Sequence, residues 1–412
     1  SNFATINYAV VPWSTTKAAI TITDGTNSDL SAAAVQAGDV TFTNAKSIST
    51  GDTMTLLDQS SITDTAKKAA QVTTDSSFKL GMYGQGTGEV SVEEGTGNVL
   101  YNVKSLRASD QTHNTVMGAA ASVALVKAGN DFIHGATEGL ALEANTGTDG
   151  IAAYAKFGGG KLRQETGSHV DVRSWNAILA VGHKNNKQKS SMEYGAFFEY
   201  GTGNYTTYGD NAQSGDGSAR YTGGGLLGKW QATDGLYVEG SLRAGNVHED
   251  ANDLLRDNTG KGYSYTTSSN YLGFHVGVGK EYKLRDGNLV DVYGQYFYNR
   301  RNSSDFMVEG DEYHLDAITS SVLRLGTRYT MKRDTWSLYG GVAYEHELDG
   351  KARGHVNGLD ISGADTSGGS FRGEIGVTFR PDDSPLTLNL NLTGYAGKKK
   401  GLSGVISAAW SF

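Results

Sequence analysis

The residues that could carry out catalysis or bind a metal lie along this chain without the spacings that such chemistry needs. A nucleophilic serine in a Gly-x-Ser-x-Gly turn, a zinc-binding His-Glu-x-x-His helix and a phosphate-binding Gly-x-x-x-x-Gly-Lys-Ser/Thr loop are all missing from the sequence. The nine histidines are scattered. The acidic stretch 249–253 could bind Ca²⁺ weakly, but solvated surface charge is the simpler explanation. The sequence therefore predicts no catalytic residue, no metal site and no cofactor.

The composition excludes further classes of protein. Forty-four acidic and 36 basic residues give a net charge of −8, which argues against a nucleic-acid partner. The chain has no cysteine and therefore no disulfide, and it has no run of 18 apolar residues, so we expect no transmembrane helix. Fifty-six glycines, three prolines and 22 tyrosines suit many twisted strands edged by aromatic side chains. Because Ser1 is neither an initiator methionine nor part of a signal peptide, we expect a mature or truncated fragment of a longer protein.

The last twelve residues, 401–412, predict the element that organises the fold. Apolar or small side chains occupy every second position back from Phe412 through Trp410, and mostly small polar ones lie between them. Stretch 386–393 (LTLNLNLT) alternates in the same way, with leucines on one face and Thr or Asn on the other. Strands with one apolar and one polar face suit a closed barrel in lipid, although the strands of a soluble antiparallel sandwich also alternate between apolar and polar residues.

About twelve such strands are expected after residue 150. Long connections near 158–168, 209–217, 247–263, 300–316 and 347–370 alternate with tight turns, which is typical of outer-membrane barrels. An even strand number also places the first strand and the C-terminus on the same side. The strands begin near Ile151, Val170, Met192, Arg220, Leu236, Tyr271, Leu289, Val322, Trp336, Phe371, Leu386 and Leu402.

Two different regions precede the barrel. Residues 109–149 are Ala-rich, with apolar residues at helical spacing and a break expected at Gly129-Asn130, so they predict a slim helix and linker. Its small side chains would allow it to thread a narrow pore, although an ordinary surface helix remains an alternative. Residues 1–108 are rich in Thr, Ser, Asp and Gly, with short strands that favour stacking into a β-solenoid. A small sandwich is the alternative there, and no repeat period can be stated.

This order of parts resembles the type Va autotransporters of Gram-negative bacteria. The resemblance covers the whole chain and is most specific over 150–412, where Gly150-Ile151-Ala152-Ala153-Tyr154-Ala155-Lys156 looks like the first strand of that barrel family and Trp410-x-Phe412 like its end. Stretch 51–57 is similar to the closing rungs of their passenger domains. One departure is Ser407, where a glycine is usual. The resemblance implies a barrel that anchors the protein and translocates it, a lumenal helix, and an N-terminal passenger displayed outside the cell.

The same resemblance implies partners and a location. Trp410 and Phe412 resemble the signal that the barrel-assembly machinery recognises, with periplasmic chaperones acting beforehand. We expect a monomeric barrel in outer-membrane lipid, with the residues before the helix at the surface of a Gram-negative cell and the passenger acting as an adhesin or in some other surface role. In relatives that cleave themselves, an asparagine of the pore helix cyclises. Asn114 and Asn130 are the candidates here, but neither lies in the Asn-Asn pair typical of those members, so we predict an uncleaved passenger.

The pleat then assigns residues to the inner wall. If Trp410 and the other apolar residues on its face of the strand point into lipid, charged residues of both signs face a hydrated lumen, where ion pairs are expected. The wall residues are Glu193, Glu199, Glu239, Arg243, Arg324, Arg328, Glu345, Arg372 and Glu374. The residues assigned to the pore helix are Asn114, Ala119, Ala120, Val123 and Asn130.

Two other functions fit parts of the pattern. A porin-like channel with a soluble N-terminal appendage would lack a helix in the lumen, since a helix there would block steady ion flow. An outer-membrane hydrolase would use polar residues in the long loops, but no Ser/His spacing or carboxylate pair supports it.

Overall fold

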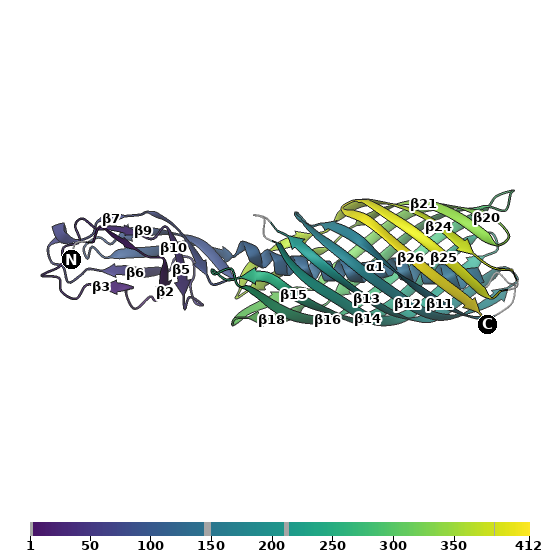
Figure 1. Ribbon diagram of the computed structural model, residues 1–412, viewed down its shortest axis with the longest axis horizontal. Coiled ribbons are helices and arrows are strands. Elements are labelled where there is room, and N and C mark those ends of the chain that lie inside the picture. Colours follow the sequence, from purple (N-terminus) through teal and green to yellow (C-terminus); the bar gives the residue numbers. More distant parts are fainter. Residues whose placement is uncertain (1–2, 144–149, 210–213, 383) are drawn as a thin grey trace.

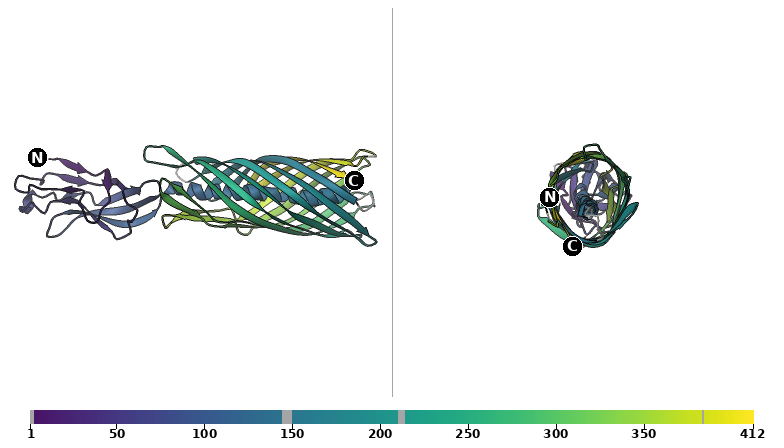
Figure 2. Two further views of the ribbon diagram at one scale, coloured as in Figure 1. Left: turned by 90° about the horizontal axis from the view of Figure 1, so that it is seen from below. Right: turned by 90° about the vertical axis from the view of Figure 1, so that its right-hand side faces the viewer.

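The computed structural model describes residues 3–143, 150–209, 214–382 and 384–412. It is elongated: an N-terminal β region projects from one end of a barrel, and the C-terminus lies at the other end (Figure 1). A single long helix runs along the barrel axis between these two ends. The view down the axis shows the helix enclosed by the wall (Figure 2).

Twelve strands within the described residues close the barrel, as the sequence predicts. All neighbours are antiparallel, and the first strand pairs with the last, with Ala152 opposite Ser411, so no open edge is left in the wall. The strands are β11 (Gly150–Glu165), β12 (His169–Lys187), β13 (Ser190–Tyr208), β14 (Ser214–Ala232), β15 (Leu236–Arg256), β16 (Gly262–Lys283), β17 (Leu289–Arg301), β20 (Ile318–Lys332), β21 (Trp336–Glu347), β24 (Gly368–Phe379), β25 (Leu386–Gly397) and β26 (Lys399–Ser411).

The barrel wall carries its apolar side chains on the outside and its polar ones on the inside, the reverse of a soluble sandwich. On β25, Leu388, Leu390 and Leu392 are 39%, 48% and 58% exposed, whereas Thr387 and Thr393 are buried. Apolar side chains therefore cover the outside and polar ones line the inside, which is the arrangement that lipid requires. The soluble sandwich is excluded by this inversion.

Most of the connections expected to be long loops turn out to be β structure. Strands β11 and β12 pair without interruption to Glu165 and His169, and β15 and β16 likewise continue beyond the apolar belt. Residues 304–315 form the hairpin β18 (Ser304–Val308) and β19 (Asp311–Leu315), and 351–365 the hairpin β22 (Lys351–Val356) and β23 (Leu359–Asp365). Beyond lipid both faces of a strand are polar, so the hydrophobic alternation fades although the strand continues. The two hairpins join in one sheet, ordered β18-β19-β22-β23.

The helix is longer and more regular than expected. A 3-10 turn, η2 (Asp110–Thr112), leads into α1 (His113–Glu143), which continues through Gly129-Asn130, so the expected break there was wrong. Within Asp110–Thr137, one window of 18 residues has a mean hydropathy of 1.2, so this helix is long and apolar enough to cross a membrane by length and composition alone. However, 78% of that apolar window is buried inside the protein.

The N-terminal region is a curled, solenoid-like sheet. Strands β1 (Thr5–Asn7), β4 (Ala34–Gln36) and β7 (Gln71–Val72) stack in parallel, as do β2 (Val10–Pro12), β5 (Asp39–Thr43) and the start of β8 (Asp75–Leu80). Thr5 pairs with Ala34 and Ala34 with Gln71, so the rung spacing grows from 29 to 37 residues, which hid the repeat in the sequence. Parallel stacking excludes the antiparallel sandwich.

The remaining strands finish this region next to the barrel. Strand β3 (Ile20–Thr21) pairs in parallel with β6 (Thr53–Asp58), and the antiparallel strands β9 (Gly84–Val92) and β10 (Val99–Ala108) close the stack. A short 3-10 turn, η1 (Thr65–Lys67), lies between β6 and β7. Edge-to-face rings fill the interior, with Phe42 5.0 Å from both Trp13 and Tyr101. One continuous apolar core then joins this region, the first half of α1 and the two hairpins.

Candidate functional site in the barrel lumen

The lumen is occupied by α1, and the small side chains of the helix are what allow it to fit. Ala119, Ala120 and Val123 are at most 5% exposed, and Asn114 and Asn130 are buried as well. A Cβ added at Gly129 would lie 2.5 Å from the Tyr221 hydroxyl, and one at Gly135 would lie 2.5 Å from Lys156 Nζ. Wall side chains therefore reach the helix backbone itself at these glycines.

An arginine from β15 holds the middle of the helix. Arg243 Nη2 donates to the carbonyl of Val126 at 2.7 Å, and Arg243 Nη1 lies 3.2 Å from Glu199 of β13. The guanidinium also lies over the Tyr271 ring, 5.2 Å from its centroid, and Tyr271 donates its hydroxyl proton to Glu199. Because the buried arginine is paired with a carboxylate, it can donate to the helix carbonyl without leaving an uncompensated charge in the interior.

One helical turn further, Asp131 connects α1 to three strands. Its carboxylate pairs with Arg324 of β20 at 2.6 Å and accepts from the Tyr395 hydroxyl of β25 at 2.8 Å. Arg324 also bonds to Glu345 of β21 at 2.9 Å. Lys156 of β11 donates to the Asp131 carbonyl at 3.0 Å. This network is charge-assisted throughout and fixes the rotation of the helix within the barrel.

Two further charged contacts lie on either side of that network. Above it, Lys127 forms an ion pair with Glu347 of β21. Below it, His134 Nδ1 lies 2.9 Å from Glu239 Oε1 of β15, and Gln295 of β17 donates to the same oxygen at 2.9 Å. We call the three helix residues that make these contacts, Lys127, Asp131 and His134, the helix clasp.

The predicted wall residues divide into two groups in the structure. Glu239, Arg243 and Arg324 contact the helix directly, and Glu199 and Glu345 support those arginines. The other four form ion pairs among themselves or with other wall residues. In that second group, Glu193 lies 3.5 Å from Lys184, and Glu374 bonds to Arg328 at 2.8 Å and Arg372 at 3.0 Å.

The sequence analysis missed the helix side of these contacts. The clasp residues stand at i, i+4 and i+7 on a helix whose other central residues are mostly small or apolar, so they share one face. That spacing was a signal in the sequence that charged side chains of the helix meet charged partners. Glu347 and Tyr395 were missed because nothing in their own strands distinguishes them from other wall residues.

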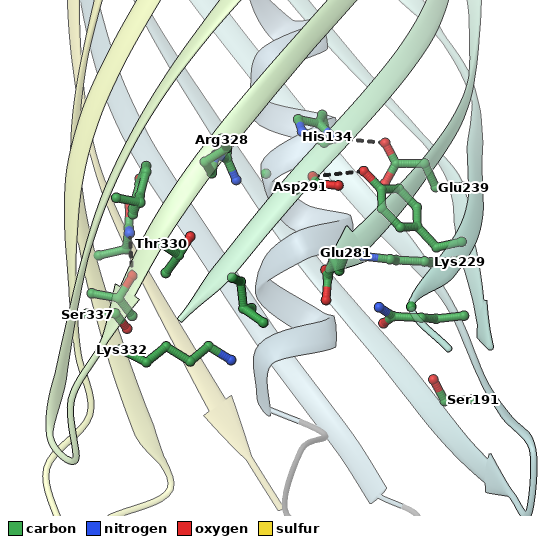
Figure 3. A pocket seen from close by; sticks show the side chains of 18 of the residues that line it. His134, Ser191, Lys229, Glu239, Glu281, Asp291, Arg328, Thr330, Lys332 and Ser337 are labelled. Atoms are coloured by element: carbon green, nitrogen blue, oxygen red, sulfur yellow. Dashed lines mark hydrogen bonds and ion pairs between the residues drawn. The ribbon is translucent and has the colours of Figure 1, made fainter. Parts of the chain in front are cut away.

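A cavity of about 680 Å³ lies in the lumen around the lower part of the helix, towards the tight turns (Figure 3). Side chains of both signs line it, including Lys229, Glu281 and Lys332, which point into it beside the His134–Glu239 pair. Such a lining suits water and small ions. Among the described residues, no group of three or more His, Cys, Asp or Glu is arranged to hold a metal.

Comparison with known proteins agrees with this geometry. The family model "Autotransporter beta-domain" matches residues 146–393. The β domain of the Bordetella autotransporter BrkA superposes with a TM-score of 0.53 at 15% identity, covering 64% of this chain and 99% of that one. The translocator domain of NalP from Neisseria meningitidis gives 0.52 at 12% identity, covering 70% and 97%. No curated protein sequence matches the chain. At these identities the structural matches show a shared fold.

Proposed function

The chain belongs to the autotransporter β-domain family, and from that premise we propose that it anchors a passenger at the cell surface and translocates it there by type V secretion. In this proposal residues 150–412 are the outer-membrane translocator, 109–149 are the helix and linker through its lumen, and 1–108 are the end of the passenger. The N-terminal region and the side of the barrel it adjoins face the outside of a Gram-negative cell.

The observation that carries the proposal is the path of the chain. The N-terminal region lies beyond one end of the barrel and the C-terminus lies at the other, and α1 connects them through the lumen (Figure 1). The outer surface is apolar and the wall is closed by hydrogen bonds, so the lumen is the polar route that the segment before β11 occupies. A chain threaded in this way is what remains once a preceding segment has passed through.

We propose further that α1 plugs the translocator once passage has finished. The clasp residues and the Arg243 bond to Val126 hold it in place. The cavity is lined in part by Asp131 and His134, which argues that the lumen around the second half of the helix is hydrated. The seal therefore depends mainly on the first half of the helix, whose side chains are packed in the apolar core. We assign no catalytic role to the barrel.

Trp410 and Phe412 are proposed as the assembly signal. Both side chains are exposed at the outer surface, 44% and 78%, at the end of the strand that closes the barrel onto β11. They are therefore accessible to the barrel-assembly machinery and to periplasmic chaperones before closure. The finished barrel is proposed to be monomeric.

The passenger is proposed to stay attached. Cyclisation would require the side-chain amide of an asparagine to attack its own backbone carbonyl. At Asn114 that amide nitrogen donates to the Leu254 carbonyl at 3.4 Å and the amide oxygen accepts from Thr207 at 3.1 Å, so both ends are engaged. Asn130 lies in the middle of an unbroken helix. An intact chain of full mass in the mature membrane supports this proposal, and two fragments meeting near Asn130 contradict it.

Planar-bilayer conductance tests the proposal against the porin alternative. The full chain is expected to stay closed, and a variant lacking residues 1–143 is expected to pass current steadily through the empty lumen. A full chain that conducts as well as the deletion variant would favour a channel and contradict the plug.

A further inference from the structure

A group of basic side chains stands on the outer surface of the barrel, at the end next to the N-terminal region. It comprises Lys161 and Arg163 of β11, Arg173 of β12 and Lys400 of β26, all exposed and on neighbouring strands. We call these four residues the outer basic patch. Two of them have protein partners: Arg163 pairs with Asp171 at 2.7 Å and Lys400 with Glu165 at 2.7 Å.

The other two have no such partner. Lys161 and Arg173 stand directly opposite each other across the β11–β12 ladder. Neither side chain makes a hydrogen bond or an ion pair within the part of the chain that the structure describes. Like charges in directly opposed positions repel each other and destabilise the pairing of two strands. An anion supplied from outside the chain would remove that repulsion.

The patch lies at the boundary of the apolar belt. Two residues below Arg173 on the same face, Trp175 is 58% exposed, and its ring stacks on that of Phe157 with 5.3 Å between centroids. Aromatic rings at this level mark the depth where lipid acyl chains give way to headgroups. The two unpaired cations therefore stand at headgroup depth.

The surface beside the rings carries no side chain at two paired positions. Gly159 lies between Phe157 and Lys161 on the outer face and is paired with Gly404 of β26, so two neighbouring strands carry no side chain there. A Cβ on Gly159 would lie 1.9 Å from the carbonyl oxygen of Ser174, so only glycine fits there, and the side chain of Leu392 borders Gly404. We call this surface without side chains the notch. Leu402 and Ile406 border it on β26.

We propose that Lys161 and Arg173 bind a phosphate group of a glycolipid in the outer leaflet, lipopolysaccharide, with one of its acyl chains in the notch over Gly159 and Gly404. Arginine matches the geometry of a phosphate through two parallel N–H donors, and lysine adds a point charge. The choice of leaflet rests on the proposed function, because that function places this end of the barrel at the cell surface. On the next two strands, β13 and β14, the residues level with Arg173 are the uncharged Asn204 and Ser218. The site is therefore confined to strands β26, β11 and β12.

The test compares lipid binding by the purified full-length chain and by the double variant K161Q/R173Q. Native mass spectrometry counts bound lipopolysaccharide, and titration with labelled lipopolysaccharide gives its affinity. We expect affinity to fall about thirtyfold in the variant, since each basic side chain beside an anionic lipid surface contributes on the order of a factor of five. The same loss is expected when the wild type is given dephosphorylated lipopolysaccharide.

The matched control is R220Q/R300Q, which removes two exposed cations from other strands of the outer surface. It should bind as the wild type does, and an unchanged shift in gel mobility on heating shows that each barrel is folded. Unchanged binding by K161Q/R173Q would overturn the proposal, and so would equal loss in the control. Equal binding of phosphatidylglycerol would overturn the assignment to a glycolipid. These binding results do not depend on cell orientation, so a failure of the proposed topology would be seen separately, by surface labelling.

Discussion

The two halves of α1 are held in the barrel by different combinations of forces. The first half, up to Val126, is packed in an apolar core with side chains such as Val116, Met117 and Val123. The second half also has a smaller apolar cluster, in which Phe132 and Ile133 pack against the wall. What distinguishes it is the helix clasp, whose ion pairs and charge-assisted hydrogen bonds lie beside a polar cavity.

The difference indicates a division of tasks. Apolar packing excludes water but has little directional preference, so it can seal the lumen without fixing one register. Ion pairs have a specific geometry, so they fix the rotation and depth of the helix in the lumen. Their polar surroundings do not exclude water. The upper half of the helix is therefore the seal and the lower half is the latch, and the two can be broken separately.

The largest effect is expected from Arg324→Ala. This change removes the cation that Asp131 and Glu345 share and leaves Glu345 only the more distant Lys399, at 3.8 Å. Breaking a buried ion pair costs up to about 3–5 kcal/mol. The helix should leave its register, seen as frequent opening in bilayer recordings and a lower unfolding midpoint in denaturant. Lys280→Ala is the control, because its ion pair with Asp234 is exposed to solvent and should contribute little to stability. An Arg324→Ala protein as closed and as stable as the wild type would show that the latch is dispensable.

A smaller effect is expected from Gly129→Leu. The new side chain meets Tyr221 and Arg243 where the wall touches the helix, and such overpacking typically costs about 1–3 kcal/mol. Hydrogen exchange should then increase in the second half of α1. The same substitution at the half-buried Ala128, on the adjacent face, is the matched comparison and should do less. Equal protection in both variants would contradict close packing at Gly129.

The seal should respond more weakly to a single truncation. Val123→Ala removes two methyl groups from the apolar half, with an expected loss of roughly 1–2 kcal/mol. Brief openings should become more frequent, and their frequency should not depend on salt. Openings of the Arg324→Ala protein, in contrast, should become less salt-sensitive than those of the wild type. A salt-dependent Val123→Ala phenotype would remove the distinction between seal and latch.

The smallest effect concerns the hairpins above the lumen. Burial raises the pKa of Asp311, at the start of β19, above its usual value, although Asn357 donates to it at 2.9 Å. A raised pKa means that folding favours the protonated form, so the stability of this hairpin should fall as pH rises from about 4 through the raised pKa. Asp311→Asn should flatten this dependence in thermal unfolding curves recorded between acidic and neutral pH. A pH dependence identical to that of the wild type would show that another group causes it.

How far the sequence predicted these regions follows from their periodicity. The strands of the barrel were found because lipid requires apolar and polar side chains to alternate with a period of two residues, and Leu386–Thr393 shows this alternation directly. The inward direction of Arg324 or Glu374 then follows from the pleat. The upper strands and the hairpins β18–β19 and β22–β23 were mistaken for loops, because outside lipid both faces are polar and the alternation carries no information.

The partners across the lumen were beyond the sequence for a different reason. Which wall residue meets Asp131 depends on the rotation and depth of the helix, and these depend on all its contacts together. The continuity of α1 through Gly129-Asn130 was also hidden, since glycine usually weakens a helix. Here it allows the close approach of Arg243 and Tyr221, and the wall compensates for its poor helix propensity.

Accessibility of single introduced cysteines tests the central claim most directly, because the chain has no cysteine of its own. Lys17→Cys places a thiol in the exposed N-terminal region, and Arg285→Cys places one in a tight turn at the opposite end of the barrel. On intact cells a membrane-impermeant maleimide should label Cys at 17 fully and Cys at 285 only after the outer membrane is permeabilised. Labelling of position 285 on intact cells, with position 17 protected, would contradict the threaded topology.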